Sequence, residues 1–215
     1  MAGVTKEEAI LFLLDKKPTE ERFGQMIEFV TDKCSDNHQL MNDLRSLYIT
    51  DKVLADKGKL MRSIANAMSD HYMNSDTIDL CRKTVSIQDE PVYLYVFDHF
   101  NPKIMGLFSW LTPLKDACHA CELFYLFNKG IFLNNPRPTG DDRLVMDAFT
   151  TSFTNFAKHG NPNGLSKCEL PAEWIPVDEN NCGRNFVFSS KCHMKEHFFE
   201  GRPAKYKEIL VKHNV

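Results

Sequence analysis

Residues 91–98, PVYLYVFD, constrain the fold of this chain more than any other segment. They are apolar almost throughout and rich in aromatic and β-branched side chains, and a polar turn follows them. This composition is typical of a strand that is buried on both faces. Such a strand requires a sheet with covering layers on both sides, which predicts an α/β fold.

The rest of the chain supplies many helices and few strands. Three strands are too few for a sheet covered on both faces, so we expect further strands to come from a segment upstream of residue 1. Apolar spacing and turn residues predict the following elements: strands over 1–4 and 186–188, three helices between 18 and 72, helices over 121–129, 141–159 and 203–213, and a long loop over 101–118.

Composition bounds the class of protein. The chain has 215 residues, of which 43% are hydrophobic, and this is enough for one globular domain or one piece of a larger one. The 26 basic and 29 acidic residues form no long block of one sign, so we expect neither a nucleic-acid partner nor binding to an anionic membrane. No apolar run approaches the ~20 residues of a membrane span, and no signal peptide is present, so the compartment stays undetermined.

Two segments resemble the type-B carboxylesterases, a family that includes cholinesterases and non-catalytic adhesion proteins. Residues 3–9, GVTKEEA, are similar to the family's strand end with its acidic pair, and residues 116–127, DACHACELFYLF, are similar to its histidine loop. Residues 91–98 resemble the strand before that loop. Residues 153–163, FTNFAKHGNPN, resemble the family's long C-terminal helix and its exit.

The resemblance implies a partial α/β-hydrolase fold, with the C-terminal part of the central sheet and its surrounding helices. Residues 1–215 would form the C-terminal portion of a carboxylesterase type-B domain whose nucleophile-bearing N-terminal part is absent. It implies that Glu8 is the acid and His119 the general base of a Ser-Glu-His triad, because the chain order in this fold is serine, acid, histidine. Phe108 and Trp110, in the loop before His119, are the candidate substrate-pocket residues.

The serine is the missing member of this triad. A nucleophile elbow needs G-x-S-x-G, and this motif does not occur in the 215 residues. The prediction is therefore a partial carboxylic ester hydrolase that is inactive alone and would act on carboxylic esters only if an N-terminal part completed it. No cofactor and no metal are implied. Ala9, Asp116 and Ala120 stand where the family commonly has glycine.

Each site residue also has a simpler interpretation. Glu8 can be the last residue of a capping box that begins at Thr5, and Glu7 could equally be the triad acid. His119 is one of eight histidines. Cys118 and Cys121 beside His119 suggest zinc ligands, but this single cluster and the polar tail with Cys182 and Cys192 favour structural thiols or a late disulfide.

Two other interpretations of the whole chain stay open. One is a non-catalytic interaction module, like the family's adhesion members, in which the fold persists without catalysis. The other is an incomplete gene model, in which upstream exons encode the elbow, the oxyanion loop and a signal peptide. Glu8 and His119 together favour a catalytic ancestry.

Overall fold

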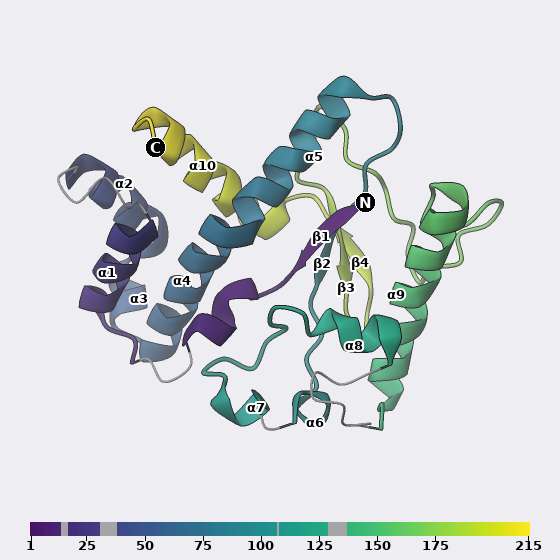
Figure 1. The fold of residues 1–215 in the computed structure, drawn as a ribbon, viewed down its shortest axis with the longest axis horizontal. Coiled ribbons are helices and arrows are strands. Elements are labelled where there is room, and N and C mark those ends of the chain that lie inside the picture. The colour runs from purple at the N-terminus through teal and green to yellow at the C-terminus, as the bar shows by residue number, and fades with distance from the viewer. Residues whose placement is uncertain (14–16, 31–37, 107, 129–136) are drawn as a thin grey trace.

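The computed structural model describes residues 1–13, 17–30, 38–106, 108–128 and 137–215. Its centre is a sheet in the order β1-β2-β3-β4, in which β1, β2 and β3 are parallel and β4 is antiparallel to β3. Helices lie on both sides of this sheet (Figure 1), so the expected α/β class is confirmed. The strands are β1 Ala2–Thr5, β2 Leu94–Phe97, β3 Asn185–Phe188 and β4 His193–Lys195.

Strands β1, β2 and β3 lie in the three segments where the sequence predicts strands. Strand β4 was not predicted, because His193 and Lys195 are exposed and three residues show no apolar pattern. Gly3 of β1 is paired with Tyr95 of β2, and a Cβ atom at Gly3 would collide with the tyrosine ring. Glycine at this position therefore lets an aromatic side chain lie flat across the neighbouring strand.

One side of the sheet is packed almost entirely by aromatic rings, and we call it the aromatic face. Helix α9, Gly140–His159, covers it (Figure 1), and the Thr139–Asp142 capping box fixes the start of that helix. The indole of Trp174 is fully buried and stacks on Phe186, with 5.2 Å between ring centroids. The aromatic face consists of Tyr95, Phe97, Phe149, Trp174, Phe186 and Phe188.

A helical group between β1 and β2 builds a second core. Helices α1, α2 and α4 correspond to the three predicted helices, whereas α3 and α5 were not predicted. Apolar periodicity does not predict helix α5, because only three of its 13 residues are buried, namely Ser75, Ile78 and Cys81. The group consists of η1 Glu8–Leu13, α1 Glu20–Val30, α2 His38–Tyr48, α3 Asp51–Leu54, α4 Lys57–Ser69, η2 Asp70–Asn74 and α5 Ser75–Ile87.

The predicted long loop over 101–118 contains two short helices, so that prediction was wrong in part. Helix α6, Pro102–Met105, begins with proline and is capped by the Asn101 side chain, which accepts the Lys103 N–H at 2.9 Å. Helix α7 spans Phe108–Leu111, and α8, after His119, spans Glu122–Phe127. A single helical turn is too short for periodicity to reveal.

The chain enters its last helix through a left-handed turn. The turn is η3, Phe198–Gly201, and the helix is α10, Arg202–Lys212. Phe199, Glu200 and Gly201 have φ of 45°, 56° and 76°, a conformation that costs about 1–2 kcal/mol for each residue with a side chain. Buried ion pairing holds α10 beyond it, since Arg202 Nε donates to Asp70 Oδ2 at 2.6 Å.

Candidate functional site

Glu8 lies just beyond β1, where the chain enters η1, and its side chain is almost completely buried. Its two carboxylate oxygens have separate partners. Oε1 accepts the backbone N–H of Thr5 at 2.6 Å, and Oε2 lies 2.7 Å from Nδ1 of His119. The carboxylate therefore caps the turn and contacts the histidine at the same time. The Thr5 hydroxyl makes no reciprocal bond among the described residues, so only half of the capping box forms.

His119 lies in the segment between α7 and α8, 111 residues after Glu8. A carboxylate oxygen can only accept, so Nδ1 carries the proton in this contact and Nε2 keeps its lone pair. The side chain of His119 is 56% exposed, and no described group binds Nε2. The ring is thus held by one nitrogen and free to take a proton on the other, which is the geometry that a general base requires.

Glu7, the alternative acid, points away from this histidine. Its Oε1 accepts from Nη1 of Arg62 at 2.7 Å, and the carboxyl group is 2% exposed. Burial raises the pKa of Glu7 to about 7, although the nearby Arg62 guanidinium opposes that rise. Of the two glutamates in the acidic pair, the structure therefore brings Glu8, not Glu7, to His119.

The structure describes the side chain of one of the two candidate pocket residues. Trp110 lies on α7 and is 86% exposed. The side chain of Phe108 lies outside the described part of the structure. Their role in binding a substrate stays a prediction.

The three positions where the family commonly has glycine differ in structure. Ala120, directly after His119, has φ of 63°, the left-handed region that glycine occupies without strain. Asp116 accepts from Nη2 of Arg62 at 2.7 Å and lies 3.3 Å from Nζ of Lys6. Ala9 is 1% exposed in the helical turn after the acid. Only Ala120 therefore carries backbone strain into the histidine segment.

The cysteines are free thiols wherever the structure describes them, and Cys34 lies outside those residues. Cys118 and Cys121 are both buried beside His119. Burial raises the pKa of the Cys121 thiol. Within the described ranges, no three His, Cys, Asp or Glu side chains are grouped to hold a metal ion.

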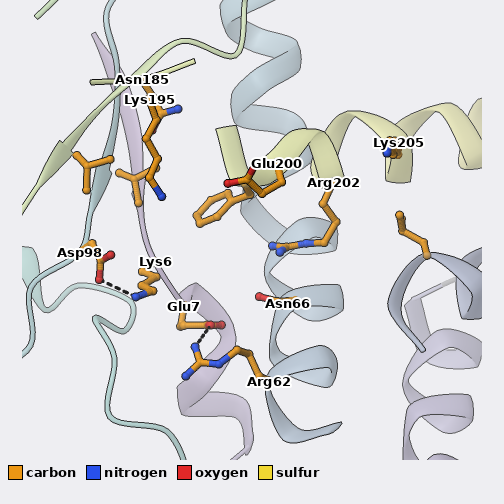
Figure 2. Close-up of a pocket in the computed structure, with 14 residues that line it drawn as sticks. Lys6, Glu7, Arg62, Asn66, Asp98, Asn185, Lys195, Glu200, Arg202 and Lys205 are labelled. Carbon is orange, nitrogen blue, oxygen red and sulfur yellow. Dashed lines mark hydrogen bonds and ion pairs between the residues drawn. The ribbon is translucent and has the colours of Figure 1, made fainter. Parts of the chain in front are cut away.

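A pocket of about 380 Å³ opens on the side of the sheet opposite the aromatic face, and we call that side the charged face. Figure 2 shows Lys6 paired with Asp98 on one side of the pocket and Glu7 paired with Arg62 on the other. Lys195 and Arg202 point toward its middle. Val96, Asn185 and Val187 form the sheet wall of this pocket.

Sequence patterns mark neither Arg62 nor Lys6, and they indicate no binding role for Asp116. An arginine on a helix carries no distinguishing signal, since charged residues on helices usually face solvent. The one available signal was Asp116 itself, a charged residue at a position where the family commonly has glycine.

Comparisons with known proteins place the chain in a family. The model of the carboxylesterase family matches residues 1–204. This chain belongs to the carboxylesterase family. The structure accordingly contains part of the family's α/β fold, a mixed sheet with helices around it.

Several relatives in this family are known by name. The chain is 31% identical to esterase cest-33 of Caenorhabditis elegans over 172 residues, which cover 80% of this chain and 30% of that protein. It is 32% identical to human bile salt-activated lipase over 110 residues, or 49% of this chain and 13% of the lipase. Human neuroligin-2 is 25% identical over 176 residues, or 76% of this chain and 20% of neuroligin-2.

The chain therefore spans less than a third of the length of these relatives. Helices long and apolar enough to cross a bilayer are absent from the described ranges.

Proposed function

We propose that this chain carries the acid and the base of a carboxylic ester hydrolase, with Glu8 and His119 as two members of a Ser-Glu-His triad. The observation that carries the proposal is the 2.7 Å contact between Glu8 Oε2 and His119 Nδ1, made by residues 111 positions apart. Family membership supports the reaction class, and the relatives named esterase and lipase support an ester substrate.

In the proposed reaction a serine hydroxyl attacks the ester carbonyl and passes its proton to Nε2 of His119. The alcohol then leaves with that proton, and the same nitrogen activates water to hydrolyse the acyl-enzyme. Glu8 holds the Nδ1–H tautomer and stabilises the imidazolium. These 215 residues contain no serine in an elbow motif, so the serine and the oxyanion donors belong to a polypeptide segment outside them.

The first experiment treats the purified chain with a fluorophosphonate probe and with a chromogenic ester. We expect neither covalent labelling nor turnover, because none of the serines in the sequence lies in a G-x-S-x-G motif. Labelling of a serine that disappears in the His119→Ala variant would show a complete site and would overturn the prediction of inactivity.

The second experiment tests the acid–base pair directly. Long-range ¹H–¹⁵N spectra of the imidazoles should show His119 as a single Nδ1–H tautomer in the wild type. Glu8→Gln should disturb that tautomer, because the amide can also donate. The matched control is Glu122→Gln, which changes a half-buried glutamate in the first turn of α8. Equal spectra for wild type and Glu8→Gln would refute the proposed pair.

A non-catalytic interaction module is the second candidate, favoured by the similarity to neuroligin-2 and by the strained Ala120. Sequencing the transcript upstream of Met1 separates the two candidates. An in-frame G-x-S-x-G supports the hydrolase. A stable 215-residue product in cells without that motif supports the interaction module.

A further inference from the structure

We propose that Arg62 and Asp116 are positioning residues that clamp the histidine segment, residues 116–121, against the acid segment, residues 5–8. The clamp keeps the imidazole of His119 on the Glu8 carboxylate. This inference rests on the proposed function and adds two residues to that site.

The clamp is built from one guanidinium group. Nη1 of Arg62 donates to Glu7 Oε1 at 2.7 Å, and Nη2 donates to Asp116 Oδ2 at 2.7 Å. Glu7 directly precedes Glu8, and Asp116 precedes His119 by three residues. Because the guanidinium is rigid and planar, these two bonds fix the separation of the two carboxylates and of the segments that carry them.

Lys6 makes a second bridge between the same segments. Its Nζ lies 3.3 Å from Asp116 Oδ1 and 3.0 Å from Asp98 Oδ1. The backbone adds one bond in the same place, where Glu7 N–H donates to the Ala117 carbonyl at 2.9 Å. Both oxygens of Asp116 are thus paired with cations, and its side chain is only 14% exposed.

The histidine segment needs such an anchor for two reasons. Its backbone passes through the left-handed conformation of Ala120, which is strained for a residue with a side chain and which a free segment would leave. The ring of His119 is mostly exposed, so packing does little to hold it. Ala117, Cys118 and Cys121 are buried and hold the segment against the core. Their side chains are small, so they do little to fix the direction in which the His119 ring points.

Loss of the clamp should move the ring without unfolding the chain. The Arg62 side chain is 42% exposed, Asp116 keeps Lys6 as a partner, and Glu7 can lose its charge by taking up a proton, so the chain should stay folded. In Arg62→Gln and Asp116→Asn we expect His119 to change from one tautomer to a mixture of two. The Nδ1 proton should exchange with water about tenfold faster, as loss of one charge-assisted hydrogen bond would allow. Arg62→Lys, which keeps the charge but only one bond, should give an intermediate result.

The test is the long-range ¹H–¹⁵N spectrum of His119 in the full 215-residue chain, with urea unfolding measured in parallel. The matched control is Arg45→Gln, which removes another arginine–glutamate pair, with Glu20, far along the helical group. A ring spectrum that changes in the Arg62 and Asp116 variants but not in Arg45→Gln supports the clamp.

The two hypotheses fail in different ways. A wild-type ring spectrum in all three clamp variants overturns the clamp and leaves the proposed function intact. Averaged tautomers already in the wild type overturn the acid–base pair, and the clamp falls with it. Should Arg62→Gln fail to fold, Asp116→Asn and Arg62→Lys carry the same comparison.

Discussion

The two faces of the sheet differ in their packing, with aromatic rings on one and a smaller aliphatic core beside a charged pocket on the other. On the aromatic face, rings from β2, β3 and α9 pack around Trp174 and exclude water. On the charged face, small aliphatic side chains of the same strands border a pocket lined by ion-paired lysine, arginine and carboxylate groups. The alternation of side chains along β2 and β3 makes this division, because neighbouring residues of a strand point to opposite faces.

The two faces should therefore contribute to different properties, one mainly to the unfolding free energy and the other to the positioning of Glu8 and His119. The aromatic face buries large apolar area and should dominate the unfolding free energy. The charged face adjoins the ends of β1 and β2, where Lys6, Glu7 and Asp98 lie, and its ion pairs link the segments that carry Glu8 and His119. Substitutions on the two faces should therefore affect different measurements.

The largest effect should come from the centre of the aromatic face. We expect Trp174→Ala to lower the unfolding free energy by about 3–5 kcal/mol, because it leaves a cavity under a fully buried ring. Val187→Ala, on the opposite face of β3, should cost about 2 kcal/mol. Urea unfolding measures both. An equal loss of unfolding free energy in the two variants would contradict the larger contribution of the aromatic face.

The next effect concerns the ion pair between Asp70 and Arg202, which lies beside the pocket of the charged face. Asp70→Asn removes the partner of Arg202, which binds it through Nε and Nη2, and weakens the bond from the Tyr48 hydroxyl. We expect a loss of about 2–3 kcal/mol, because an unpaired guanidinium then stays in a mostly buried place. Lys207→Gln is the control, since it breaks an exposed pair with Asp76. A control as damaging as Asp70→Asn would contradict this.

A pH dependence should follow from Glu7. Its folded-state pKa, about 7, lies above the ordinary value of 4.5, so the folded chain holds this proton more tightly than the unfolded one. Its stabilising contribution is complete below pH 4.5 and is lost as the pH rises through 7. The Glu7→Gln variant lacks this loss, so its stability relative to wild type should rise by about 3 kcal/mol between pH 4.5 and 8. A pH-independent difference would show that Arg62 keeps Glu7 ionised.

The smallest effect should be a gain of stability. Ala120→Gly relieves the left-handed strain beside His119, and the flexible glycine offsets part of the gain, so we expect about 0.5–1 kcal/mol of stabilisation. Ala9→Gly serves as the control. Ala9 is buried and has no positive φ, so this variant should be less stable than the wild type. A loss of stability in Ala120→Gly would show that this backbone is not strained.

The aromatic face was predictable from the sequence to a large extent. Residues 91–98 predicted a strand covered on both faces, and the stripe over 141–159 predicted the helix that covers one of them. Trp174 was not identified, because it lies outside helices and strands and so has no periodic pattern to place it.

The charged face was much harder to predict. The resemblance of short motifs selected Glu8 and His119, and the structure brings their side chains into contact. Their catalytic roles stay predictions. Arg62 could not be selected, because its importance depends on a contact between residues more than 50 positions apart, which no local pattern encodes.

The left-handed turn at Phe199, Glu200 and Gly201 has a consequence for local unfolding and for proteolysis. Phe199 and Glu200 have the disfavoured hand, and we expect them to keep it only while β4 and α10 are both docked. When α10 detaches, residues 199–201 should relax into an extended conformation that a protease can bind and cleave. The first cut under native conditions should therefore release the C-terminal helix.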